Sequence, residues 1–263
     1  MNPATLQLDN AVVYDFLQRF IREELRTRGF TEANIAVSGG LDSALVLRLV
    51  VDSIGAGHVH PVFLPCRTSS GDSRRDARVM FESCGLPWDE FNISPMADAY
   101  LATQPGIDNV RTGNLMARLR MAVVFDRSKR DSGLVIGTGN KSELLVGYST
   151  WYGDMACSMV PLGDLYKTQV RSLAAHVGIS AQILAKPPSA DLWPGQTDES
   201  EIGVSYEVLD QILYLLVDEQ RSATDVAAQG FDADVVRRVE RKMASSQFKR
   251  VLPPIAKLSQ RAV

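Results

Sequence analysis

The chain has 263 residues, of which 45% are hydrophobic and 22% are charged, and its formal net charge at pH 7 is −3. This length suits one large α/β domain, or one domain with a helical appendage. The small negative charge excludes the global basic field that draws proteins to nucleic acid.

Cysteine usage and hydrophobicity restrict the class further. The three cysteines are widely spaced and form no CxxC pair, so neither a disulfide framework nor a zinc site is indicated. The N-terminal residues have neither the basic nor the apolar region of a signal peptide. No uncharged apolar run approaches the ~18 residues that cross a bilayer. We therefore expect a cytoplasmic protein without a membrane or nucleic acid partner.

Strands and helices are predicted to alternate through residues 1–180. In chain order we predict a helix capped by Asp9 or Asn10 and ended by Gly29, a strand at 34–37, a helix at 41–54, a strand at 58–65, a helix capped by Asp72 or Ser73 and ending near 83, a strand at 88–93, a short helix at 96–103, a basic helix at 109–130 and a strand at 133–139. A helix near 141, a loop at 147–163, a helix at 164–178, a loop at 186–200, helices at 205–218, 222–229 and 233–247, and a basic tail at 248–263 follow.

This alternation predicts an α/β fold, a doubly wound and mostly parallel sheet with helices on both faces. We expect residues 1–263 to form one domain, with the C-terminal helices at 200–247 packed on it. Ligands bind at the carboxyl ends of the strands in such sheets. The glycine-containing loops at 38–43 and 137–139 both follow predicted strands, so we expect them to form one site.

The first of these loops reads Ser38-Gly39-Gly40-Leu41-Asp42-Ser43. Its glycines allow a sharp turn and close approach of backbone N–H groups to a ligand. The helix that follows contributes unpaired N–H groups and the positive end of its dipole, so the loop is suited to phosphate. It is neither a Walker loop nor a GxGxxG fingerprint. A carboxylate beside phosphates is explained by a bridging divalent cation. The alternative is a plain turn whose aspartate or serine caps the helix.

The SGGLDS loop resembles the pyrophosphate-binding loop of the N-type ATP pyrophosphatases, which have an adenine nucleotide alpha hydrolase-like fold. Four later segments look like successive blocks of the ammonia-dependent NAD synthetases: NLMARLRM at 114–121, GTGNKSELLVGYSTWYGD at 137–154, PLGDLYKTQVRSLA at 161–174 and PPSADLWPGQTDESEIG at 187–203. The resemblance implies a homodimeric AMP-forming carbon–nitrogen ligase. Its substrates would be deamido-NAD, ammonia and ATP with Mg²⁺, and the reaction would pass through an acyl-adenylate.

The same resemblance implies roles for individual residues. Asp42 and Lys167 would be catalytic, and Asp42 and Glu143 would bind Mg²⁺. The residues implied for ATP are Ser38, Gly39, Gly40, Asp42, Ser43, Thr138, Lys167 and Ser189. Those implied for the dinucleotide substrate are Asn114, Arg118, Tyr148, Trp151, Asp154, Phe248 and Lys249.

The residue types agree with these roles. Asn114 and Arg118 are i, i+4 neighbours on one helix face, and Lys167 is interpreted as a mobile point charge suited to polyphosphate. The loops at 147–163 and 186–200 are predicted to act as lids that keep water from a reactive intermediate. Structural alternatives exist: Arg118 in a solvated basic face with Arg111 and Arg120, Lys167 paired with Asp164, Ser189 as a loop residue only, and Glu143 as a first-turn helix charge.

The chain departs from the family pattern on the acceptor side. Trp151, Ser158 and Phe248 stand where the family commonly has lysine, aspartate and histidine. We expect a subgroup that binds the same substrate with stacking in place of charge. The alternative is an amidoligase of the same ATP group that acts on another carboxylate. A fused nitrilase-type glutaminase does not fit in 263 residues, so we expect free ammonia or a separate glutaminase as the nitrogen source.

Overall fold

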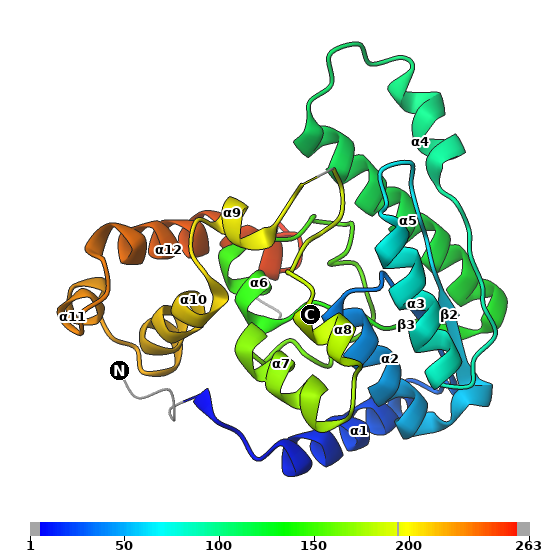
Figure 1. Ribbon diagram of the computed structural model, residues 1–263, viewed down its shortest axis with the longest axis horizontal. Coiled ribbons are helices and arrows are strands. Elements are labelled where there is room, and N and C mark those ends of the chain that lie inside the picture. Colours follow the sequence, from blue (N-terminus) through cyan, green and yellow to red (C-terminus); the bar gives the residue numbers. More distant parts are fainter. Residues whose placement is uncertain (1–5, 194, 257–263) are drawn as a thin grey trace.

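The computed structural model describes residues 6–193 and 195–256 (Figure 1). A parallel sheet of strand order β2-β1-β3 lies at its centre. β1 spans Glu32–Ala36, β2 spans Val59–Val62 and β3 spans Gly133–Val135. A single bridge extends the pairing beyond each outer strand, from Phe63 to Glu90 and from Ile136 to Met159.

Alternate residues of the sheet enter two different cores, because successive strand side chains point to opposite faces. Ile35 belongs to the core that contains α1 (Asn10–Thr27) and α2 (Leu41–Ile54). Ala36 packs against the core formed with α5 (Asn109–Asp131). Helices therefore cover both faces of the sheet, which confirms the predicted doubly wound α/β fold.

The remaining helices are α3 (Gly71–Ser83), α4 (Ser94–Leu101), α6 (Lys141–Val146), α7 (Lys167–His176), α8 (Ala181–Ala185), α9 (Asp198–Ile202), α10 (Tyr206–Leu213), α11 (Ala223–Ala228) and α12 (Ala233–Ser246). A π-helical turn, Tyr214–Asp218, continues α10. Short 3-10 turns lie at Ala56–His58 and Gln247–Arg250. Among the described residues, no helix is both long and apolar enough to cross a membrane.

Several sequence predictions need correction. The segment predicted as a strand at 88–93 forms one bridge, at Glu90, and no regular strand. The Phe91 and Ile93 amides donate to the Phe63 and Pro65 carbonyls, but Pro65 has no N–H with which to donate back. Ser70 caps α3 instead of Asp72 or Ser73. The helices α8 and α9 were not predicted, and α9 begins inside the predicted loop at 186–200. The Asp9 cap of α1 is confirmed.

The C-terminal helices share a core of their own. Leu209 and Ile212 of α10 pack with Val226 of α11 and Val236 of α12, to one side of the sheet (Figure 1). The same cluster includes Val146 of α6 and Tyr166, so it reaches the segments that follow β3. Of the predicted tail at 248–263, residues 257–263 lie outside the described part of the chain.

Candidate active site

A cavity of about 530 Å³ opens at the carboxyl end of the sheet. β1 lies between β2 and β3, so the direction of winding reverses at β1. A switch point of this kind leaves a crevice at the strand ends where ligands bind. Both predicted loops line this cavity, through Ser38, Gly40 and Ser43 on one side and Gly137 and Thr138 on the other.

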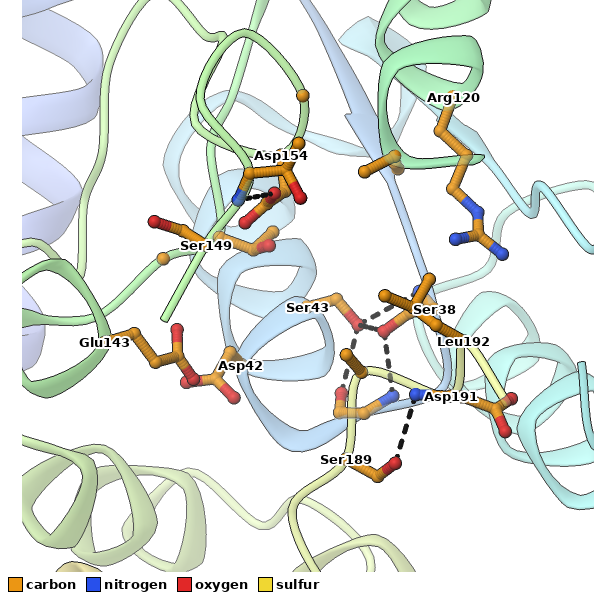
Figure 2. Close-up of a pocket in the computed structure, with 18 of the residues that line it drawn as sticks. Ser38, Asp42, Ser43, Arg120, Glu143, Ser149, Asp154, Ser189, Asp191 and Leu192 are labelled. Atoms are coloured by element: carbon orange, nitrogen blue, oxygen red, sulfur yellow. Dashed lines mark hydrogen bonds between the residues drawn. The ribbon is translucent and has the colours of Figure 1, made fainter. Parts of the chain in front are cut away.

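The loop after β1 is held in shape by its own two serines. The Ser43 hydroxyl accepts a hydrogen bond from the Ser38 amide at 3.1 Å and donates to the Gly40 carbonyl at 3.0 Å. The Gly40 amide donates to the Ser38 hydroxyl at 3.2 Å (Figure 2). Gly40 is the N-cap of α2, and no side chain of the described residues caps that helix. The interpretation of this loop as a turn with an aspartate or serine cap is therefore wrong.

Gly39 brings this loop into close contact with α3. Its φ is +80°, and a Cβ atom at this position would lie 2.2 Å from the Ser73 carbonyl oxygen. Neither the backbone conformation nor the space admits a side chain without displacing α3.

We expect Gly39→Ala to lower the free energy of unfolding by about 3 kcal/mol, because overpacking adds to the cost of a left-handed alanine. Ligand binding at the cavity should weaken with it, because the loop must move away from α3. Gly29→Ala is the matched control, since Gly29 has φ +74° and open space around it. Its cost should be about 1 kcal/mol without loss of ligand binding. Denaturant unfolding measures both variants, and equal losses would contradict the steric argument.

Two carboxylates and one ammonium group form the polar centre of the cavity. The Lys167 Nζ atom donates to Asp42 Oδ2 at 2.5 Å and to Glu143 Oε1 at 3.1 Å. Figure 2 shows the carboxylates of Asp42 and Glu143 turned toward each other. Lys167 is only 3% exposed, so the prediction of a mobile point charge is wrong. The alternative that Lys167 pairs with Asp164 is also wrong, because the Asp164 carboxylate pairs with the Lys141 ammonium at 3.0 Å.

Burial and charge act against each other at this centre. Burial raises the pKa of Glu143 to about 7, although the nearby Lys167 favours the ionised form. Burial alone would lower the pKa of Lys167, but attraction by Asp42 and Glu143 outweighs it and the pKa lies above its usual value. The ring of Tyr206 lies 5.3 Å from the ammonium and adds a cation–π contact.

Asn140 aligns the two carboxylates from the start of α6. Its side-chain amide donates to Asp42 Oδ1 at 2.9 Å, and its Oδ1 accepts from the Glu143 amide at 3.0 Å. The Glu143 carboxylate completes a capping box by accepting from the Asn140 amide. Glu143 is therefore a first-turn helix charge, and it also lines the cavity.

The donor set of this centre fits Mg²⁺. Mg²⁺ prefers oxygen ligands and is commonly held by one or two carboxylates together with substrate phosphates. Asp42 and Glu143 supply two carboxylates that both contact the Lys167 ammonium. Both carboxylates line the same cavity as the glycine loop at Ser38–Ser43. These two residues would hold the ion.

Residues 186–193 and Gln196 also line the cavity, next to the start of α3. The Ser189 hydroxyl donates to the Gln196 carbonyl at 2.7 Å and accepts from the Asp191 amide at 3.0 Å. The Asp191 carboxylate accepts from the Ser70 amide at 3.0 Å and from the Ser73 hydroxyl at 2.8 Å. The loop is therefore attached to the start of α3, and Ser189 both shapes the loop and lines the cavity.

The acceptor side is built from α5 and the loop after α6. Thr150 donates from its hydroxyl to Asn114 Oδ1 at 2.8 Å and from its amide to Asp154 Oδ1 at 2.7 Å. The Lys249 ammonium donates to the carbonyls of Gly147 and Ser149, at 2.8 and 2.7 Å. Asn114, Asp154 and Lys249 all line the cavity. Asn114 and Lys249 are hydrogen-bonded to the segment at 147–154, and Asp154 is the last residue of that segment.

Comparison with known proteins places this geometry in a family. The NAD synthase family model matches residues 13–253. The chain belongs to the NAD synthase family. The NH(3)-dependent NAD(+) synthetase of Chlorobaculum tepidum is 44% identical over 261 residues, covering 99% of this chain and 94% of the relative.

Solved structures agree with this assignment. The NMN synthetase of Francisella tularensis has a TM-score of 0.85 at 30% identity, covering 96% of this chain and all of that chain. The NH3-dependent NAD synthetase of Campylobacter jejuni has a TM-score of 0.82 at 27% identity, with 95% and 100% coverage. The fold and the family recognised in the sequence are thereby confirmed.

Three residues implied for substrate by the NAD synthase resemblance do not line the cavity. Arg118 is exposed and donates to the Trp151 carbonyl at 3.2 Å. The Trp151 ring stacks on Tyr152 at 4.4 Å and meets the edge of Phe248 at 5.2 Å. The expected stacking therefore occurs between protein side chains, and these residues lie beside the cavity wall instead of in it. Tyr148 does line the cavity and donates to Glu201 at 2.5 Å.

Other lining residues of this NAD synthase family member were not singled out from the sequence. Arg120 points into the cavity and donates to the Leu64 carbonyl at 2.9 Å, so it does not belong to a solvated basic face (Figure 2). Lys186 donates to the buried Asp76 at 3.0 Å. Asp198 is 4% exposed and accepts from the Tyr206 hydroxyl at 3.1 Å. The clearest sequence signal for any of them is the position of Lys186 and Asp198 in or next to the PPSADLWPGQTDESEIG block.

Proposed function

We propose that this protein converts deamido-NAD to NAD by ATP-dependent amidation with ammonia, releasing AMP and pyrophosphate. The observation that carries the proposal is the pair of carboxylates, Asp42 and Glu143, joined by the buried Lys167 next to the Ser38–Ser43 loop. Such a centre suits ATP with Mg²⁺, and the same cavity extends to Asn114, Asp154 and Lys249. The relatives named NH(3)-dependent NAD(+) synthetases support the same reaction.

In the first step the nicotinate carboxylate oxygen attacks the α-phosphorus of ATP, and pyrophosphate departs with the electron pair of the broken P–O bond. The first backbone amides of α2, which begins within the Ser38–Ser43 loop and has no side-chain cap among the described residues, stabilise the charge that develops on the leaving pyrophosphate. Asp42 and Glu143 would hold Mg²⁺, which would supply further neutralisation of that charge. Thr138 and Ser189, which line the same region, contact ATP in this arrangement.

In the second step ammonia attacks the carbonyl carbon of the acyl-adenylate. The bond from that carbon to the AMP oxygen breaks, AMP leaves with the electron pair, and the nitrogen loses a proton. The chain contributes mainly positioning and exclusion of water. The segment at 186–193, attached through Asp191, and the segment at 147–154, held by Lys249, provide the two walls that protect the intermediate.

We further propose that residues 1–263 act as one domain in a cytoplasmic homodimer that uses free ammonia. The core shared by α6 and the C-terminal helices supports the single domain. Arg118, Trp151 and Phe248 would then contact the dinucleotide from the rim of the cavity and not from within it.

The test is an assay of the purified protein with ATP, Mg²⁺, ammonium and deamido-NAD, in which AMP and NAD are measured together. We expect equal amounts of the two products. Nicotinic acid mononucleotide serves as the comparison acceptor, because one similar structure is an NMN synthetase. AMP formation only with an acceptor other than deamido-NAD would replace the proposal by the alternative amidoligase. No AMP with any acceptor would refute both.

A further inference from the structure

Asp210 is a fully buried carboxylate in the middle of α10, outside the catalytic cavity. An unpaired charge in such a place would be strongly destabilising. Its two oxygens have different partners on two different helices. Oδ1 accepts from the Ser142 hydroxyl at 2.5 Å, and Oδ2 accepts from the Thr168 amide at 2.8 Å.

These partners are the sequence neighbours of the catalytic centre. Ser142 precedes Glu143 in the first turn of α6, and Thr168 follows Lys167 in the first turn of α7. The Ser142 hydroxyl, which donates a hydrogen bond to Asp210, also accepts one from the Lys167 amide at 2.9 Å. One carboxylate and one hydroxyl therefore join the backbones that carry Glu143 and Lys167.

The distance between these two helices decides the geometry of the centre. Lys167 Nζ meets Glu143 and Asp42 at the same time, and Glu143 stands on α6 while Lys167 stands on α7. A shift of the start of α6 would move the Glu143 carboxylate away from Asp42, and a shift of the start of α7 would move the Lys167 ammonium away from both carboxylates. Groups that fix the orientation of metal ligands commonly change metal affinity or activity by 10–100-fold when they are removed.

We propose that Asp210 is a positioning residue, which holds Glu143 and Lys167 at the separation that Mg²⁺-ATP binding requires. The C-terminal helices thereby take part in the catalytic unit through α10. This inference rests on the proposed function for its kinetic consequences, but binding of Mg²⁺-nucleotide can be measured without turnover.

Asp218 offers a matched control. It lies in the π-helical turn after α10 and accepts from Lys141 Nζ at 2.8 Å and from the Tyr166 hydroxyl at 2.5 Å. It thus ties the C-terminal helices to the starts of the same two helices, α6 and α7. Its bonds are to side chains, however, and neither Lys141 nor Tyr166 lines the cavity. Loss of Asp218 loosens the attachment without breaking the link between Ser142 and Lys167.

The experiment compares the wild type with Asp210→Asn and Asp218→Asn. Calorimetry measures binding of α,β-methylene-ATP with and without Mg²⁺, and kinetics measures kcat and the Mg²⁺ concentration for half-maximal rate. For Asp210→Asn we expect Mg²⁺-dependent nucleotide binding and kcat to fall by about tenfold or more. The KM for deamido-NAD should stay within about twofold, because the acceptor side does not contact Asp210. Asp218→Asn should change nucleotide binding and the Mg²⁺ requirement by less than about twofold.

Unchanged Mg²⁺-dependent binding in folded Asp210→Asn would overturn the proposal, as would an equal loss in Asp218→Asn. Should Asp210→Asn fail to fold, Ser142→Ala removes only the hydroxyl of the link. It should weaken Mg²⁺-dependent nucleotide binding in the same direction, and wild-type binding by this variant would also overturn the proposal. Failure of the proposed function would instead appear as a wild type that binds Mg²⁺-nucleotide but forms no AMP with deamido-NAD.

Discussion

Asp42→Asn is expected to lower kcat/KM for ATP by about a thousandfold or more while the fold persists. The substitution removes the negative charge that a divalent ion requires, and the loss of several kcal/mol of charge stabilisation corresponds to this factor. The substituted side chain keeps the size of aspartate and one hydrogen bond. The side-chain amide of Asn140 donates to Asp42 Oδ1 at 2.9 Å, and it can donate to an asparagine oxygen in the same way. AMP release under saturating Mg²⁺ measures the effect.

The same helix provides the control. Asp52 lies near the other end of α2, where it accepts from the Tyr14 hydroxyl at 2.7 Å and from Arg48 at 2.8 Å, away from the cavity. Asp52→Asn should keep wild-type turnover, although it removes a carboxylate from the same element. If Asp42→Asn retains turnover within about tenfold of the wild type, Asp42 is not a metal ligand in the reaction.

Hydrophobic runs and glycines in the sequence predicted the part of the site that is formed by consecutive residues. The buried strand, the Ser38–Ser43 loop and the apolar helix after it follow one another in the chain, so hydrophobic runs and glycines were sufficient. Because the carboxyl ends of parallel strands lie at one edge of a sheet, the sequence also predicted that Thr138 and Glu143 lie near this loop. Both residues follow β3, the strand that pairs with β1. The family resemblance implied a role for Lys167 at this site, and Lys167 does line the cavity, but its environment was predicted wrongly. Its partner Asp42 is 125 positions away, and only the packed structure shows that both carboxylates enclose it.

The errors arise at helix residues for which the sequence does not decide whether the side chain faces the protein interior or the solvent. Arg118 and Arg120 both lie on the basic helix α5, and the tertiary contacts alone direct Arg120 toward Leu64 and leave Arg118 exposed. Asp210 could not be found for a similar reason. Its partners, Ser142 and Thr168, are 68 and 42 residues away, and an aspartate in an amphipathic helix is ordinarily a solvated charge.

Lys167→Met is expected both to abolish amidation and to lower the free energy of unfolding by about 3 kcal/mol when Mg²⁺ is absent. Removal of one partner from a buried ionic cluster leaves the other charges uncompensated. Here two carboxylates, Asp42 and Glu143, would face each other without the ammonium that separates them. Mg²⁺ should restore part of the loss, because an ion that binds only the folded chain stabilises it by mass action. Denaturant unfolding with and without Mg²⁺ measures both quantities.

Lys141→Met is the matched control for this stability effect. Lys141 also contacts two carboxylates, at 2.8 Å for Asp218 and 3.0 Å for Asp164, but the Asp164 side chain is 96% exposed. Water can solvate the Asp164 carboxylate after the ammonium is removed. The free energy of unfolding should therefore fall by about 1 kcal/mol, with or without Mg²⁺. A Lys167→Met protein that is as stable as the Lys141→Met protein, and that gains nothing from Mg²⁺, would mean that Asp42 and Glu143 do not form a cation site. A gain specific to Lys167→Met would mean that the ammonium and the metal ion neutralise the same two carboxylates.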